Sequence, residues 1–202
     1  MARSKKVVRS KKQPVSHVEW KKEVFRQSFH LAFGLFLSGI LFFTNLDFFR
    51  SVAFVLLGVG IILVLLARAK TFPALNNLLQ KVHREHEKIP GQSAFVFLIG
   101  ALIPALLFPN SFAVFLGVFA MTLQDGFSTL VGVRFGRTKI LPRKTVEGSL
   151  GGFVACAVGL LFFLPFSLAL PLALFATLVE LLPIDDSLTI PVAVAFVARL
   201  FV

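Results

Sequence analysis

Residues 125–149 combine acidic, glycine and basic residues in one short segment between two apolar runs. The segment contains Asp125, Gly126, Gly132, Arg134, Gly136, Arg137, Lys139, Arg143, Lys144 and Glu147. Carboxylates bind Mg²⁺, the metal bridges phosphate oxygens, and lysine or arginine neutralises the remaining charge. Glycines let backbone N–H groups approach a phosphate closely. These residue types predict a site for a phosphorylated, metal-bearing ligand at the edge of a membrane.

Four further ionisable residues are expected on the same side of the membrane as this segment. Glu180 lies near the end of one apolar run, Asp185 and Asp186 lie in the turn before the next, and His30 lies near the start of the first. At about 1.5 Å per residue, Asp125 and Glu180 lie roughly 20 Å from the outer ends of their helices, close to the inner interface. Because an ionisable residue inside a membrane costs at least about 2.5 kcal/mol, such residues indicate function.

Some of these residues also have a purely structural interpretation. Gly132 and Gly136 have the small-x-x-x-small spacing that packs membrane helices together. The basic residues can serve topology alone, although topology does not explain the acids beside them. His30 follows Arg26 by one helical turn on the same face. Its role stays open between a hydrogen-bonded structural residue and a residue that supports the site.

Seven apolar runs must position these residues. They cover roughly residues 28–46, 48–67, 93–108, 111–131, 149–164, 167–182 and 187–202. Hydrophobic residues make up 56% of the 202-residue chain and charged residues 15%, so the chain is far more apolar than an average soluble domain. Several runs are shorter than the about 20 residues usually needed to span hydrocarbon. The sequence predicts an all-α, polytopic membrane helix bundle with six or seven transmembrane helices.

The basic residues gather in three segments. Of 21 lysine and arginine residues, nine lie in 1–26, five in 67–92 and five in 132–148. With seven helices these segments share one side of the membrane, which the positive-inside rule makes cytoplasmic. Topology thus explains the net charge of +11, and no nucleic-acid partner is expected. We predict a cytoplasmic N-terminus, a basic tail with a lead-in helix at 1–26, and one transmembrane catalytic domain at 27–202.

Three motifs occur in order along the chain. The first is R-Q-S-F-H-L-A-F-G, the second is D-G-F-S-T-L-V-G-V-R-F-G-R-T-K followed by R-K-T-V-E-G-S, and the third is E-L-L-P-I-D-D-S-L-T-I-P. Together they resemble the CTP-dependent lipid-alcohol kinases, which include dolichol kinase, phytol kinase and the CTP-dependent diacylglycerol kinase. The resemblance covers nearly all of residues 26–192. The chain departs from the family pattern at Gln124, usually Gly, at Ser128, usually Ala, and at Ser187, usually Asn.

The resemblance implies transfer of the γ-phosphoryl group of CTP, or of another nucleoside triphosphate, to the hydroxyl of a membrane-embedded lipid alcohol, with Mg²⁺. The positive-inside rule puts this chemistry on the cytoplasmic face. The catalytic residues would be Asp125 and His30. The nucleotide would be held by Gly132, Arg134, Gly136, Lys139, Lys144 and Glu147. The metal would be held by Asp125, Glu147, Glu180, Asp185 and Asp186.

Other functions remain open at this point. A cytidylyltransferase that condenses CTP with a lipid phosphate would need the same metal and cations. A transporter would place its ionisable residues near the bilayer midplane, whereas these gather at one face. A non-catalytic membrane scaffold is suggested only by Ser187. Apolar helix walls do not distinguish dolichol, shorter polyprenols, phytol and diacylglycerol. In a prokaryote the protein would lie in the cell membrane.

Overall fold

The computed structural model describes residues 17–68, 92–141 and 144–202. These residues form seven α-helices and one small antiparallel hairpin. The elements are α1 (His17–Phe43), α2 (Leu46–Arg68), α4 (Gln92–Leu107), α5 (Ser111–Phe135), β1 (Lys139–Leu141), β2 (Lys144–Thr145), α6 (Val146–Leu160), α7 (Phe166–Glu180) and α8 (Asp186–Ala198). The all-α class is confirmed, and the hairpin is an element that the sequence did not predict. Residues 1–16 of the expected basic tail lie outside the described residues.

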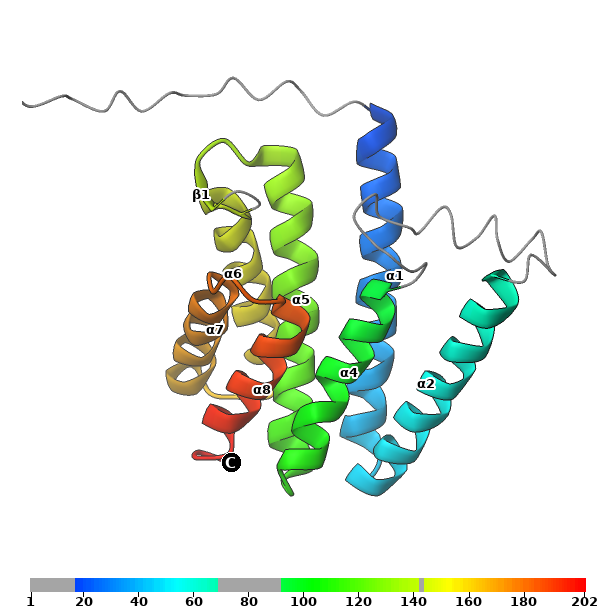
Figure 1. Cartoon of the computed structure of the whole chain (residues 1–202). Coiled ribbons are helices and arrows are strands. Elements are labelled where there is room, and N and C mark those ends of the chain that lie inside the picture. The colour runs from blue at the N-terminus through cyan, green and yellow to red at the C-terminus, as the bar shows by residue number, and fades with distance from the viewer. Residues whose placement is uncertain (1–16, 69–91, 142–143) are drawn as a thin grey trace, which may run out of the picture.

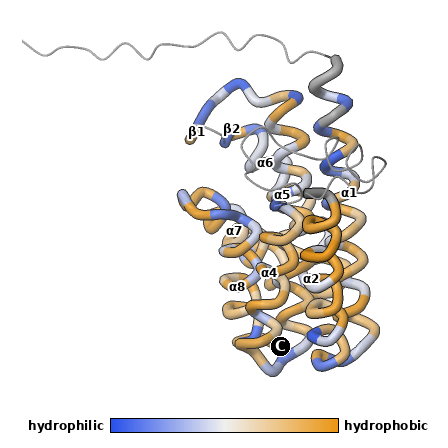
Figure 2. Tube along the Cα trace, turned by 45° about the vertical axis from the view of Figure 1, so that its right-hand side comes forward, coloured by the Kyte–Doolittle hydropathy of each residue, from blue (hydrophilic) through white to orange (hydrophobic). Residues whose placement is uncertain are grey.

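The seven helices coincide with the seven apolar runs, and their lengths differ. Within the described ranges, three helical segments are long and apolar enough to cross a membrane, at Glu23–Phe43, Leu46–Leu66 and Ser111–Phe135. The other four apolar helices are shorter. Figure 2 shows that apolar residues run along the bundled helices, whereas hydrophilic residues concentrate around the hairpin and the start of α1. This distribution is consistent with a membrane protein.

Helix α5 is the centre of the bundle. It packs against α6, α8 and α1, while α7 lies against α6 and α8 (Figure 1). Helix α4 contacts α8, and α2 contacts α4. The side chains of Leu116, Val118 and Met121 on α5 are fully buried, as are Phe49 of α2 and Phe97 of α4. The core therefore surrounds α5, the helix that carries Asp125.

Two glycines bring α8 close to its neighbours. A Cβ atom at Gly100 would lie 1.7 Å from the carbonyl oxygen of Ser187, and one at Gly117 would lie 2.4 Å from that of Pro191. Any larger residue would push α8 away from α4 or α5. These contacts place the first turn of α8 beside the other helices and bury Ser187, the residue that replaces the usual Asn.

The hairpin connects α5 to α6. Lys139 pairs with Thr145, and Leu141 pairs with Lys144, with an irregular register between the two pairs. The Thr145 side chain then caps α6 by accepting a hydrogen bond from the Gly148 N–H at 3.1 Å. This cap starts α6 directly after β2, so that Lys144 is held against the bundle while Lys139 is exposed.

Candidate active site

Three carboxylates and one lysine meet where α7 ends and α8 begins. They are Asp125 of α5, Glu180 of α7, Asp186 of α8 and Lys144 of β2, and we call them the acidic cluster. Asp125 lies close enough to Glu180 and Asp186 to repel both, and Lys144 attracts the same two carboxylates. Glu180 is only 3% exposed. The structure thus brings together four of the residues that the sequence singled out.

His30 of α1 lies against the acidic cluster. Its Nε2 atom is 3.1 Å from Oδ2 of Asp125, although the approach does not make a hydrogen bond. The imidazole ring stands edge-on to Phe97, with 4.4 Å between the ring centroids. His30 is therefore held between an aromatic ring and a carboxylate. Among the residues that the structure describes, its buried Nε2 atom has no hydrogen-bond partner, so this atom keeps its capacity to bond a substrate group.

Lys144 pairs directly with Asp186. The lysine Nζ donates a hydrogen bond to Oδ1 of Asp186 at 2.6 Å, and the two side chains are 17% and 19% exposed. A partly buried pair of this kind keeps one cation facing the carboxylates. Of the two hairpin lysines that the structure describes, Lys144 is consequently the one that the fold assigns to the acidic cluster.

A buried amide network orients Glu180. Gln124 Nε2 donates to Oε2 of Glu180 at 2.8 Å, and the Thr177 hydroxyl lies 3.3 Å from Gln124 Oε1, which it can donate to. The Ser128 hydroxyl, by contrast, donates to the backbone carbonyl of Asp125 at 3.3 Å. Gln124 is fully buried, and a Cβ at Gly152 would come within 2.6 Å of its Nε2. Of the departures at Gln124 and Ser128, the first therefore supplies a donor to a buried carboxylate and the second bonds the backbone of α5. The sequence marked these positions as departures, but it did not predict this role.

We expect Gln124→Leu to destabilise the protein by about 1–3 kcal/mol, because the buried Glu180 carboxylate would lose a donor. Urea or thermal unfolding in detergent measures the change. Thr177→Val is the matched comparison, since it removes only the hydroxyl near the amide, and we expect it to cost less. Equal stability of Gln124→Leu and the parent protein would show that this amide does not hold Glu180.

The carboxylate of Glu147 accepts hydrogen bonds from the loop that precedes the hairpin. Its oxygens accept backbone N–H hydrogen bonds from Arg137 at 3.0 Å and Thr138 at 3.2 Å. These bonds, with that from Arg137 the strongest, lower the pKa of Glu147 from 4.5 to about 2. Glu147 precedes the apolar segment of α6 that begins at 149. The structure thus gives this predicted metal and nucleotide ligand a role in holding the loop.

We expect Glu147→Gln to loosen this loop at neutral pH, because the amide replaces a charge-assisted acceptor with a neutral one. Since the folded-state pKa is depressed, the stabilisation is fully present above about pH 4.5 and is lost as the pH falls toward about 2. Hydrogen exchange of the Arg137 and Thr138 amides, compared between variant and parent, measures the loosening. The difference in unfolding free energy between the two proteins should shrink over the same pH interval. A difference that is independent of pH would contradict this assignment.

The other predicted residues lie away from the acidic cluster or in packing positions. Asp185 is exposed and caps α8, because its Oδ1 accepts the Ser187 N–H at 3.0 Å. Arg134 is exposed and lies over the Trp20 ring, 5.6 Å from its centroid. A Cβ at Gly132 would lie 3.1 Å from Thr145 Oγ1, and one at Gly136 would lie 2.3 Å from the Gly132 carbonyl. Close packing accounts for both glycines, and their contact with nucleotide stays a prediction.

The five predicted metal ligands do not form one metal-binding group. Within residues 17–68, 92–141 and 144–202, no three His, Cys, Asp or Glu side chains are placed to hold a metal together. Mg²⁺ commonly binds through one or two carboxylates, with phosphate oxygens and waters completing its coordination. The carboxylates of the acidic cluster fit that mode of binding, in which the ligand brings part of the coordination.

Comparison with known proteins identifies the family. Residues 15–198 match the cytidylyltransferase family, so the chain belongs to this family, which includes CTP-dependent lipid kinases such as dolichol kinase. The chain is 33% identical over 186 residues to an uncharacterized protein of Methanocaldococcus jannaschii, an alignment that covers 87% of this chain and 92% of that protein. No solved structure matches the chain. The resemblance predicted from the three motifs is confirmed at the level of the family.

Proposed function

We propose that this protein is a membrane-embedded kinase that transfers the γ-phosphoryl group of CTP to the hydroxyl of a lipid alcohol. The observation that carries the proposal is the contact of His30 with Asp125 inside the acidic cluster, at 3.1 Å. A hydroxyl bound beside His30 Nε2 would lie within hydrogen-bond reach of the Asp125 carboxylate, which could then take its proton. The products would be a lipid monophosphate and CDP.

The number of cations beside the acidic cluster favours a neutral acceptor. The carboxylates of Asp125, Glu180 and Asp186 lie near one ammonium, from Lys144. In both reactions Lys144 and Mg²⁺ must offset the charge of the CTP triphosphate, and a lipid phosphate would add about two further negative charges that also need cations. A lipid alcohol adds none. The cytidylyltransferase alternative, which takes its support from the family, requires the charged acceptor.

Each residue has a definite role in this proposal. Asp125 accepts the hydroxyl proton as the alcohol oxygen bonds to the γ-phosphorus, and the bond from that phosphorus to CDP breaks. His30 Nε2 holds the hydroxyl in place. Lys144 neutralises charge on the phosphates. One or two carboxylates, from Glu180 and Asp186, would hold Mg²⁺, which when bound supplies charge neutralisation to the phosphates. We place this chemistry on the cytoplasmic face, where the basic segments are expected.

Product analysis tests the proposal against its alternative. The purified protein in lipid nanodiscs would be given CTP labelled at either the α- or the γ-phosphate, with a lipid alcohol or a lipid phosphate as acceptor. A kinase leaves the γ-label on the alcohol and releases CDP. A cytidylyltransferase leaves the α-label on the lipid and releases pyrophosphate, and this result would overturn the proposal. Asp125→Asn protein prepared in parallel controls for contaminating kinases.

A further inference from the structure

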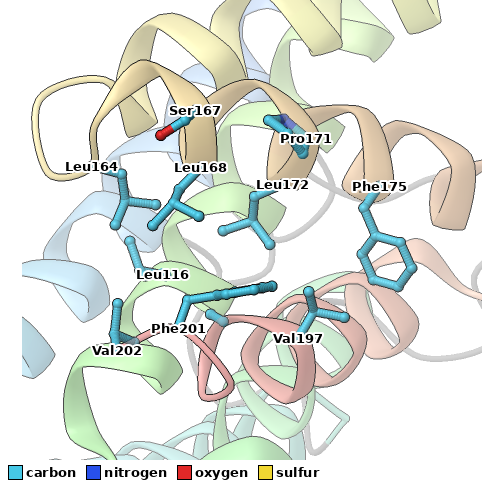
Figure 3. Close-up of a pocket in the computed structure, with 11 residues that line it drawn as sticks. Leu116, Leu164, Ser167, Leu168, Pro171, Leu172, Phe175, Val197, Phe201 and Val202 are labelled. Carbon is cyan, nitrogen blue, oxygen red and sulfur yellow. The ribbon is translucent and has the colours of Figure 1, made fainter.

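An apolar cavity of about 290 Å³ lies between α7, α8 and α5. Its walls include Leu168 and Phe175 of α7, Val197 of α8 and Leu116 of α5, and Phe201 closes one side (Figure 3). We call it the α7–α8 groove. Among the described residues that line it, Ser167 alone has a polar side chain and none is charged.

The groove and the acidic cluster share the same two helices. Along α7, Phe175 lies five residues and Ser167 thirteen residues before Glu180. At about 1.5 Å per residue, the groove extends from roughly 7 Å to roughly 20 Å below Glu180. The opposite wall belongs to α8, whose first residue is Asp186. A molecule with its polar end at the acidic cluster would therefore reach the groove by extending along these helices.

The lining decides the chemical class of the occupant. A nucleotide or a headgroup placed there would lose its hydrogen bonds to water and find almost no partner, which costs several kcal/mol per group. An alkyl or isoprenoid chain loses nothing of this kind and gains dispersion contacts along both walls. The occupant that fits is an apolar chain.

We propose that the α7–α8 groove binds the far part of the acceptor's hydrocarbon chain. This inference rests on the proposed function, because it takes the hydroxyl of that acceptor to lie at the acidic cluster. A chain shorter than about 7 Å ends before the groove, whereas a chain of about 20 Å fills it. The groove therefore makes the enzyme select for long-chain lipid alcohols through contacts remote from the reacting atoms.

Two variants that fill the groove test this selectivity. Ser167→Trp and Val197→Phe add bulk to the groove from opposite walls. Leu174→Trp is the control, because it adds bulk on α7 at a residue that is 52% exposed and does not line the groove. Each protein would be assayed for phosphate transfer from CTP to a short and a long isoprenoid alcohol. We expect both groove variants to lose about tenfold in kcat/KM for the long alcohol, the effect of roughly two buried methylenes, and to keep the short-alcohol rate. Leu174→Trp should behave as the parent protein.

The results separate the failure of the groove from failure of the proposed function. The inference is overturned if the parent protein phosphorylates both alcohols and the groove variants either lose both rates by the same factor or keep both rates. In either case the groove does not select for chain length. If the parent phosphorylates neither alcohol, the kinase assignment itself fails.

Photo-cross-linking tests whether the groove binds the chain, independently of turnover. A long isoprenoid alcohol with a photoreactive group at its chain end would be bound to the parent protein and to Ser167→Trp, and labelled peptides mapped by mass spectrometry. We expect label on α7 and on the segment from α8 to Phe201, reduced in Ser167→Trp and competed by unlabelled long alcohol. Label spread equally over exposed α2, or competed equally by a phospholipid of the same chain length, would show that the groove holds only bulk lipid.

Discussion

Replacing Asp125 by Asn is expected to abolish phosphoryl transfer and leave the protein folded. The amide keeps the shape of the side chain but cannot accept the hydroxyl proton, and it removes the charge that faces His30 Nε2 at 3.1 Å. Loss of a positioned general base typically lowers the rate by about 10²–10⁴-fold. The measurement is the initial rate of labelled phosphate transfer from CTP in nanodiscs, with thermal unfolding as the check on the fold.

Asp47→Asn provides the matched control for this prediction. This substitution makes the same chemical change in α2, where the Asp47 side chain is 88% exposed and pairs with Arg50. We expect this variant to transfer phosphate at the parent rate. If Asp125→Asn retained activity within a factor of about ten of the parent protein, Asp125 would not be the proton acceptor.

Replacing Lys144 by Met is expected to impair both catalysis and stability. Met keeps most of the length of the side chain but removes the ammonium that would face the phosphates, so the rate should fall by about 10²-fold and the KM for CTP should rise. Asp186 would lose the donor that lies 2.6 Å away. Because both side chains keep some exposure, we expect a loss of about 1–3 kcal/mol, below the about 3–5 kcal/mol of a fully buried pair.

A double variant separates the two effects. Lys144→Met with Asp186→Asn removes both charges, so stability should recover relative to Lys144→Met while activity stays low. Lys139→Met is the comparison on the same hairpin, where the exposed cation should have a smaller effect on rate. A Lys144→Met protein with an unchanged rate and KM but reduced stability would show that the ion pair is only structural.

Composition and the position of the apolar runs were enough to predict the helical class. Because a segment in hydrocarbon must pair all of its backbone N–H and C=O groups internally, it forms a helix, and apolar runs bounded by polar residues therefore mark the helices directly. The described helices fall on the seven predicted runs, and the three ordered motifs led to the family that residues 15–198 match. The hairpin was missed because its two strands are short and polar, and their pairing depends on how α5 and α6 are joined.

The roles of the individual acidic residues could not be predicted from the sequence. Glu147 and Asp185 have the same chemistry as Glu180 and Asp186, and the sequence treated all four as metal ligands. The structure uses Glu147 for the N–H groups of Arg137 and Thr138, and Asp185 for the first turn of α8. Carboxylates accept hydrogen bonds from any nearby donor, so their role is set by which donor the fold brings within reach.

The sequence by itself determined the apolar helices, the family and the residue types available for chemistry, because these follow from local composition and from ordered motifs. Only the tertiary structure decided that Lys144, rather than exposed Lys139, faces the carboxylates, and that Gln124 is the residue that holds Glu180. The physical reason is that hairpin register and helix rotation choose the partner of each side chain. Both depend on packing between elements distant in the sequence, as when Gly152 lies against Gln124.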